Sequence, residues 1–456
     1  MAHTYDVRVW SIELYKGATK TTYIVPWKVG ERRWRERFAT RALADSFRSD
    51  LISATRKGEA FDTTTGRPVS FAHPEQDLRW LEFACDYIDM KWPTAAATYR
   101  RSLSEALTAI TVAIIDADRD RPDAKVLRSA LHRWAFNTSR RDSDCPVDVR
   151  DALRWVRRNS PAVSRLAETD VLRRVLGRIS TRLDGKPGAV TVVNQRRRVL
   201  YNVAEYAVER KCIAANPIPA VKWKAPKSTG QVDKRTVVNP VQARVLLNSV
   251  RKTRRSGPRL VAFFGLMYFS ALRPEEAANV RKQNLTLPAN GWGEVYLERA
   301  TPHAGSDWTN DGRARDERAL KHRATGEGRF VPVPPELVAT LRQHIAELGT
   351  APDGRLFVGQ RAADLPKITY LRAWRAARRL AFTPEVAAGP LAATPYSLRH
   401  ACVSTWLNGG VPAPQVAEWA GHSVEVLLNV YAKCIDGQEA NARRRVMQAL
   451  GYAEAP

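Results

Sequence analysis

Apolar and polar side chains alternate along the first part of the chain, which is the period of a β-strand with one buried face. The alternating apolar positions are Tyr23, Val25, Trp27 and Val29, followed by Trp34 and Phe38. Gly17 and Gly30 stand where hairpin turns would fall. The pattern therefore predicts a small three-stranded antiparallel sheet.

A helix is predicted directly after this sheet, from Arg41 to about Ala54, with Thr40 as its cap. Its expected buried face carries Ala42, Leu43, Phe47 and Leu51. Residues 1–57 hold twelve lysines and arginines against six acidic residues. A sheet with a basic open face has a shape that enters a DNA groove, so this pattern favours DNA over a merely solvated surface.

The apolar period changes to three and four residues from Glu75 to about Cys212, after a connector rich in Thr, Gly and Pro. This spacing is typical of amphipathic helices. Helices are predicted at 75–90, 95–116, 123–136, 147–158, 164–180 and 190–212. We expect residues 75–213 to form an all-α domain.

Residues 214–236 form the clearest linker, with three prolines and five basic residues against one acidic residue. Prolines keep such a segment extended, and a basic extended segment can follow a phosphate backbone. Residues 237–456 then mix helices with short strands. The helices are predicted at 239–253, 259–272, 274–282, 334–348, 366–381, 397–408, 412–420 and 438–450, and the strands at 294–298 and 330–333. The predicted fold class is a multidomain α+β chain whose last domain is mixed α/β.

The charge balance narrows the choice of partners. The 456 residues include 73 Lys and Arg against 47 Asp and Glu, a formal net charge of +26. Nucleic acid is the usual polyanion that such an excess binds. Acidic lipid is the competitor, but the longest apolar run, 260–272, is too short to span a bilayer.

The sequence shows no sign of a secretory signal, a disulfide framework or a zinc site. The N-terminus lacks the basic and apolar regions of a secretory signal. The five cysteines are widely spaced with no CxxC, so neither a disulfide framework nor a zinc site is expected. The sequence predicts a cytoplasmic, nucleic-acid-binding protein with no cofactor, no metal and no membrane partner.

Four stretches of the last domain combine residues suited to phosphate chemistry. They contain Arg273 before Pro274, Lys321 before a glycine-containing turn, Tyr396 and Arg399 on one helical face, and His422 followed by Tyr431. Each has a plain structural explanation when taken alone. Arg273 could pair with Glu276, Lys321 could be an ordinary surface residue, and Tyr431 could be a core aromatic at a helix end.

Taken together, the four stretches resemble the tyrosine recombinase (phage integrase) family, whose pattern is Arg … Lys … His-x-x-Arg … His … Tyr. Arg273 stands in a Leu-Arg-x-x-Glu context, Arg399 in Ser-Leu-Arg-His, and His422 in Gly-His-Ser with Tyr431 nine residues later. The sequence departs from the family in two places. Tyr396 stands where histidine is usual, and Ala271 replaces the common glycine before Leu-Arg.

The resemblance covers the whole chain and implies a role for each part. Residues 1–60 resemble the arm-binding domain of integrases from actinobacterial mobile elements, and 75–213 resemble the core-binding domain. Residues 214–236 would then be the interdomain linker, and 237–456 the catalytic domain. The implied partners are double-stranded DNA attachment sites, bound as a tetramer, with a directionality factor (excisionase) and a host DNA-bending protein as accessory partners.

The resemblance also implies a role for each site residue. Arg273 and Arg399 would clamp the non-bridging phosphate oxygens with planar, permanently charged donors, and His422 would add a donor. Tyr431 would attack phosphorus to give a 3′-phosphotyrosine, while Lys321 would protonate the leaving 5′-oxygen. Tyr396 would hydrogen-bond the phosphate or the surroundings of the nucleophile.

Three functions fit these observations. The first is a site-specific recombinase that integrates and excises a mobile element. The second is a type IB topoisomerase-like enzyme, against which the separate N-terminal module argues because relaxation needs no second DNA sequence. The third is a non-catalytic DNA-binding regulator, against which the five other intact site positions argue.

Overall fold

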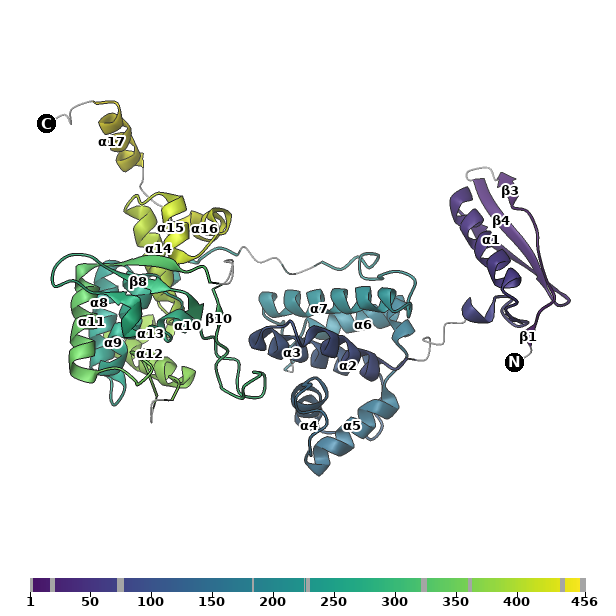
Figure 1. The fold of residues 1–456 in the computed structure, drawn as a ribbon, viewed down its shortest axis with the longest axis horizontal. Coiled ribbons are helices and arrows are strands. Elements are labelled where there is room, and N and C mark those ends of the chain that lie inside the picture. The colour runs from purple at the N-terminus through teal and green to yellow at the C-terminus, as the bar shows by residue number, and fades with distance from the viewer. Residues whose placement is uncertain are drawn as a thin grey trace. The chain divides into compact units, whose positions relative to one another are not determined.

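The computed structural model describes residues 3–16, 21–71, 78–182, 184–224, 226, 230–320, 326–359, 363–434 and 439–451 (Figure 1). The chain divides into two compact units. Unit 1 is Met1–Thr94 with Leu103–Pro226, and unit 2 is Ala95–Ser102 with Lys227–Pro456.

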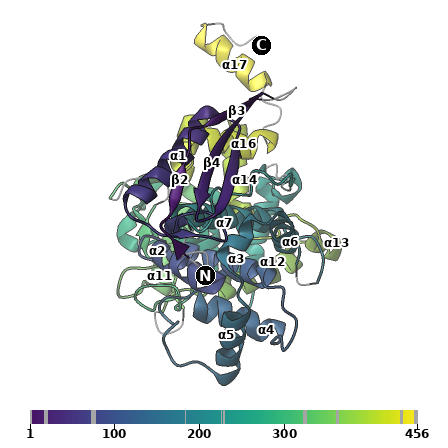
Figure 2. The same ribbon diagram turned by 90° about the vertical axis from the view of Figure 1, so that its right-hand side faces the viewer.

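Unit 1 begins with a sheet built around the long strand β4, Thr21–Val29 (Figure 2). Strand β5, Arg32–Phe38, pairs with one edge of β4, and the turn between them places Gly30 at a φ of +55°. Strands β2, Val7–Val9, and β3, Glu13–Lys16, both pair with the other edge. The described sheet thus has four strands where three were expected, because the first strand is interrupted.

Proline explains the interruption. Pro26 accepts a hydrogen bond from Trp10 N at 3.1 Å but has no N–H to return to that edge. The carbonyl of Trp10 instead accepts from Arg48 Nε at 2.8 Å. The first strand therefore leaves the ladder at this point and rejoins it as β3. A short two-stranded pair, β1 (His3–Thr4) with β6 (Phe61–Asp62), lies outside the main sheet.

Helix α1, Arg41–Arg56, packs on the sheet, and Thr40 caps it by accepting from Leu43 N at 3.4 Å. The sequence pattern places Ala42 and Leu43 on the buried face, but both are exposed, because the stripe that meets the sheet begins at Ala44. The core of this module consists of Val25, Trp27, Val29, Ala44, Leu51, Ala54 and Phe61. Trp27 Nε1 also donates to Gly66 O at 2.5 Å, so the residues after α1 complete the module.

The described residues from 78 to 226 form helices and loops, with two isolated β-bridges. The helices are α2 (Trp80–Lys91), α3 (Ala97–Ile114), α4 (Ala124–Ala130), α5 (Val147–Asn159), α6 (Thr169–Ile179) and α7 (Val190–Glu209). A π-helix over Leu131–Ala135 continues α4, as the predicted helix 123–136 requires. The predicted helix 164–180 is divided, because a 3₁₀ turn at Val163–Ala167 ends before α6 begins.

Unit 2 surrounds the apolar helix α9, Gly257–Phe269, which packs against α8 (Pro240–Arg251), α11 (Pro335–Leu348) and α14 (Tyr396–Asn408). A three-stranded sheet has the order β11 (Arg329–Val333), β8 (Gly293–Leu297), β7 (Leu285–Thr286). The remaining elements are β9 (Arg299–Ala300), β10 (Arg318–Ala319), α10 (Pro274–Ala277), α12 (Lys367–Ala381), α13 (Pro384–Ala388), α15 (Ala413–Ala420), α16 (Val424–Tyr431) and α17 (Glu439–Ala449). The helix predicted at 274–282 ends already at Ala277, and α13 was not expected.

Helices α14, α15 and α16 lie together in unit 2 (Figure 1), and a second, smaller core is buried between them. Its buried members include Ala271, Val403, Leu427 and Tyr431. Val232, from the predicted linker, is also buried in this cluster, and its N–H donates to Val430 O at 2.9 Å. The end of the linker is therefore part of unit 2. None of the described helices is long and apolar enough to cross a membrane.

Candidate active site

Five of the six predicted site residues lie in the described part of unit 2, and the fold brings them together. Arg273 stands at the corner between α9 and α10, Tyr396 and Arg399 open α14, His422 follows α15, and Tyr431 ends α16. Lys321 lies outside the described residues.

Arg273 is fixed at the start of α10 by three hydrogen bonds. Its backbone N–H donates to Glu276 Oε2 and its Nη1 to Glu276 Oε1, both at 2.8 Å, while Nη2 donates to Gly421 O at 2.9 Å. Pro274 starts the helix and keeps Arg273 extended, with a ψ of 151°. Burial disfavours the charged guanidinium and by itself would lower the pKa of Arg273. The negative charge of Glu276 acts in the opposite direction, and the net effect is a raised pKa. The arginine thus pairs with Glu276 and also faces the site.

A second arginine, Arg329, shares the same carboxylate. Its Nη1 and Nη2 donate to Glu276 at 3.1 and 2.9 Å, and its Nε donates to Trp419 O at 3.0 Å. Glu276 is 2% exposed and Arg329 3%. Burial alone would raise the pKa of Glu276, but Arg329, Arg273 and Arg399 lower it to about 2. One ionised carboxylate therefore holds two buried guanidinium groups in place.

Arg399 is fully buried one turn into α14. Its Nη1 donates to Ala271 O, and its Nη2 donates to Ala420 O at 2.5 Å and lies 2.9 Å from His422 Nε2. Burial and the charge of Arg273 lower the pKa of Arg399. Since Arg399 has no acceptor atom, His422 Nε2 accepts this bond and the ring proton belongs on Nδ1.

The backbone carbonyl that receives Arg399 belongs to a strained residue. Ala271 is fully buried and has a φ of +52°, in the left-handed region that disfavours residues with a Cβ. The family's usual glycine would take this conformation without strain. Alanine in place of glycine therefore costs folding free energy at this position, although the two side chains differ by only one methyl group.

Tyr431 is fully buried, and its hydroxyl lies 2.8 Å from His400 Nδ1. The ring of Tyr431 stacks on His422 with a centroid distance of 6.2 Å. Burial raises the pKa of Tyr431. Tyr396 is half-buried and turns its ring edge-on to His400 at 5.0 Å. None of the described residues hydrogen-bonds the Tyr396 hydroxyl.

The arrangement is an anion site built beside a phenol. Three guanidinium groups, Arg273, Arg329 and Arg399, surround a single carboxylate, so the cluster keeps an excess of positive charge. Burial, together with the same charges, lowers the pKa of His422 to about 3, so its imidazole is neutral near pH 7. Such a site suits a phosphate group approached by the Tyr431 hydroxyl.

Residues 237–436 match the model of the phage integrase family. This segment of the chain therefore carries a phage integrase family domain. No curated protein matches the chain in sequence.

Several solved structures resemble the chain at low sequence identity. A fragment of the Tn1549 transposon integrase in complex with a circular intermediate DNA is 15% identical, with a TM-score of 0.49, and covers 68% of this chain and 96% of its own. The XerH recombinase bound to difH is 12% identical, with a TM-score of 0.43, and covers 76% and 94%. Lambda integrase bound to DNA is 15% identical, with a TM-score of 0.40, and covers 66% and 93%.

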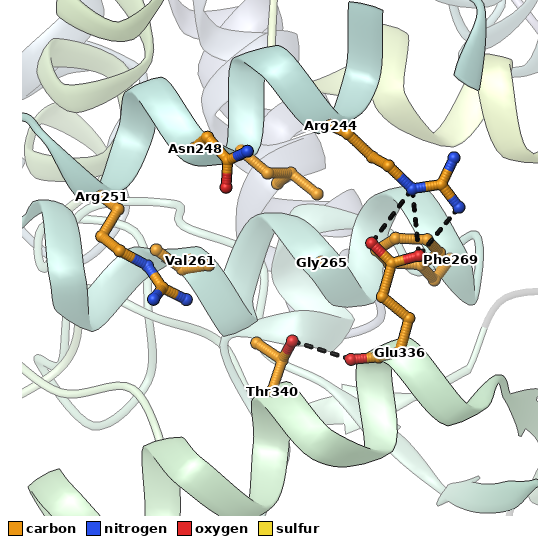
Figure 3. Close-up of a pocket in the computed structure, with 9 residues that line it drawn as sticks. Arg244, Asn248, Arg251, Val261, Gly265, Phe269, Glu336 and Thr340 are labelled. Atoms are coloured by element: carbon orange, nitrogen blue, oxygen red, sulfur yellow. Dashed lines mark hydrogen bonds and ion pairs between the residues drawn. The ribbon is translucent and has the colours of Figure 1, made fainter. Parts of the chain in front are cut away.

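A pocket elsewhere in unit 2 lies between α8, α9 and α11 (Figure 3). Arg244 binds Glu336 at its rim, with Arg244 Nη2 2.8 Å from Glu336 Oε2. None of the candidate site residues lines this pocket. Within the described part of the chain, no group of three or more His, Cys, Asp or Glu side chains is placed to hold a metal ion.

Sequence reasoning missed two residues of the site, Arg329 and His400. Arg329 directly precedes the predicted strand 330–333, and it lies two residues before Val331 and four before Val333, which face the core. Because every second side chain of a strand points to the same face, this spacing indicates that Arg329 also points inward. His400 directly follows Arg399, but one sequence alone gives no reason to expect it next to Tyr431.

Proposed function

We propose that this protein is a site-specific recombinase that cuts and rejoins DNA at the attachment sites of a phage or integrative element through Tyr431. One observation carries the proposal: the fully buried Tyr431 lies in the same cluster as the buried Arg399, and His422 contacts both. The charges come from segments far apart in the chain, and one carboxylate cannot neutralise them. A phosphodiester supplies the missing negative charge.

The proposed reaction uses the residues that the sequence analysis singled out. Tyr431 Oη attacks phosphorus, a P–O bond to Tyr431 forms, and the bond to the 5′-oxygen breaks. Lys321 gives its proton to that leaving oxygen. Arg273 and Arg399 hold the non-bridging oxygens, and His422 Nδ1 is the ring nitrogen left to donate. The covalent bond conserves the energy of the phosphodiester, so the 5′-hydroxyl of another strand can reverse the step without a nucleotide cofactor.

The rest of the chain positions the DNA. Residues 1–60 would bind arm-type sites, residues 75–213 the core site, and the basic segment 214–236 would follow the backbone between the domains. Residues 237–456 would carry the chemistry within a tetramer that holds two duplexes in the bacterial cytoplasm. An excisionase and a host DNA-bending protein would set the direction.

A Tyr431→Phe variant tests the nucleophile. The variant should bind attachment-site DNA like the parent and form no covalent complex on a nicked suicide substrate, because only the attacking oxygen is lost. Tyr370→Phe is the matched control, since Tyr370 is buried in the larger core of unit 2, away from the cluster. Covalent capture by the Tyr431→Phe protein would transfer the role to Tyr396 or Tyr452.

A second experiment separates recombination from strand relaxation. The parent protein should exchange markers between two plasmids that each carry an attachment site. A protein that relaxes supercoils but leaves the plasmids unrecombined would favour the topoisomerase-like function. A protein that binds the sites without covalent capture would favour the regulator.

A further inference from the structure

We propose that His400 is the general base that takes the proton from Tyr431 as the tyrosine attacks phosphorus. The inference rests on the proposed function, because it concerns the step in which Tyr431 becomes the nucleophile. It assigns this role to the residue after Arg399, one helical turn beyond the position where the family usually has histidine.

The geometry places a nitrogen of His400 on the reacting atom. His400 Nδ1 lies 2.8 Å from Tyr431 Oη, within the reach that a general base needs. The centroids of the two rings are 5.6 Å apart. His422, the other histidine of the site, contacts Tyr431 by ring stacking, and its Nε2 is taken by Arg399. In the described site, His400 is therefore the histidine placed to accept the phenolic proton.

The helix explains why Tyr396 does not take this role. Tyr396 and His400 are four residues apart on α14 and share a face, so their rings meet at 5.0 Å. Tyr396 brings a phenol to this face and no basic nitrogen. Its ring packs edge-on against His400 and so orients the imidazole toward α16.

The protonation states agree with the assignment. Burial and the charge of Arg399 lower the pKa of His400 to about 4, so the imidazole is neutral near pH 7 and Nδ1 can accept a proton. Burial raises the pKa of Tyr431, so the phenol does not ionise unaided. A bound phosphodiester adds negative charge nearby, which favours the imidazolium and raises the basicity of His400 toward the working pH.

The groups that face this pair come from several elements. They are Tyr396, Arg399 and Cys402 on α14, His422 on the turn before α16, and Cys434 after it. Arg399 is the charged member, and it disfavours the imidazolium. The phosphate must offset this charge, which couples proton transfer to the presence of substrate.

The step balances in atoms and charge. The Tyr431 O–H bond breaks, the proton moves to His400 Nδ1, and the oxygen pair forms the bond to phosphorus. The bond from phosphorus to the 5′-oxygen breaks, and that oxygen takes a proton from Lys321. In the reverse step, the His400 imidazolium returns its proton to Tyr431 as the phosphotyrosine bond breaks.

Single-turnover cleavage of a nicked core site tests the assignment with a His400→Gln variant, which keeps polarity but has no basic nitrogen. We expect the variant to cleave about 10²-fold more slowly than the parent near pH 7. The deficit should shrink as the pH rises to about 9, because hydroxide then replaces the base. A fluorinated tyrosine at position 431, with a more acidic phenol, should restore more rate to the variant than to the parent.

A structural role for His400 would give a different result. It would lower the rate by the same factor at every pH and would show no selective rescue by fluorotyrosine; either result overturns the assignment. His344→Gln is the matched control, since His344 is buried in the same unit and bonds Leu356 O. If the Gln variant fails to fold, His400→Asn replaces it with the same expected profile.

The two proposals can fail separately. A parent protein that forms no covalent complex contradicts the proposed function, and the role of His400 falls with it. A parent protein that is trapped through Tyr431, beside a His400→Gln variant that cleaves at the parent rate, contradicts the general base alone.

Discussion

Ala271 shows how one methyl group can matter at the centre of the site. The residue is fully buried with a φ of +52°, and its carbonyl accepts from Arg399. The left-handed conformation costs a residue with a Cβ about 1–2 kcal/mol. The strained residue therefore stands within the buried arginine cluster, beside Arg399.

Replacing Ala271 by glycine should therefore stabilise the protein. Relief of the left-handed strain exceeds the entropy that glycine adds to the unfolded chain, so we expect a gain of about 0.5–1 kcal/mol in the free energy of unfolding. Urea denaturation measures it. The control is Ala401→Gly within α14, which should lose about 1 kcal/mol because the site is helical. A loss of stability in both variants would show that the left-handed conformation of Ala271 does not strain the folded protein.

Glu276 holds two arginines, so neutralising it should be costly. Glu276→Gln leaves Arg273 and Arg329 buried without a counter-charge, and we expect a loss of about 3–5 kcal/mol in the free energy of unfolding. Glu336→Gln is the matched control. Its pair with Arg244, drawn in Figure 3, is exposed to solvent, so the loss there should stay below about 1 kcal/mol. Equal losses of stability in the two variants would show that burial of the ion pair does not determine its contribution to folding.

At the residue scale, the sequence motif contains five residues that the fold brings into one cluster, and each of them has a fixed local context. Arg273 and Glu276 stand three residues apart, and both the pairing and the corner between helices follow from that spacing. Arg329 joins them from 53 residues away. No local pattern predicts such a contact, because the strand register and the position of α10 decide it.

At the scale of elements, period and caps predict helices well and strands less well. The 3.6-residue period identifies α8, α11 and α12 to within two residues at each end. The first strand of the N-terminal sheet is different. Alternation cannot reveal that Pro26, on the neighbouring strand, withholds the donor that the first strand needs. The residue that interrupts the first strand belongs to the neighbouring strand, so the interruption can be recognised only when the pairing of the two strands is known.

The N-terminal sheet module has a core of its own, so its removal should spare the chemistry. Phe61 is fully buried in that core and Phe71 packs against it, so the deletion should end at residue 71. We expect the shortened protein to cleave a core site at nearly the parent rate and to lose integrative recombination on long attachment sites. Full recombination by the shortened protein would show that the module does not bind arm sites.

At the scale of the whole molecule, buried neutral histidines make stability depend on pH. Burial lowers the pKa of His422 to about 3 and that of His400 to about 4, from an ordinary value of 6.5. Between these values the unfolded chain binds more protons than the folded one, so folding stability falls as the pH falls. Glu276, with its pKa lowered to about 2 from 4.5, acts in the same direction at lower pH.

Chemical denaturation at a series of pH values measures this dependence. We expect the free energy of unfolding to be highest near pH 7 and to fall steadily through about pH 4. The His422→Gln variant should show a smaller slope below about pH 6.5, since it removes one of the groups that titrate. An unchanged slope in the variant would mean that His422 is protonated in the folded protein.

The hydrogen bond between Val232 and Val430 determines where the chain can be shortened for laboratory work. Val232 is buried beside Leu427 and Tyr431, although it lies before residue 237, where the family match begins. A fragment that starts at the family boundary would expose this small core to water and remove the backbone partner of the residue before Tyr431. A fragment that starts at residue 230 keeps both. Crystallisation and split-protein designs should therefore place the break upstream of residue 230.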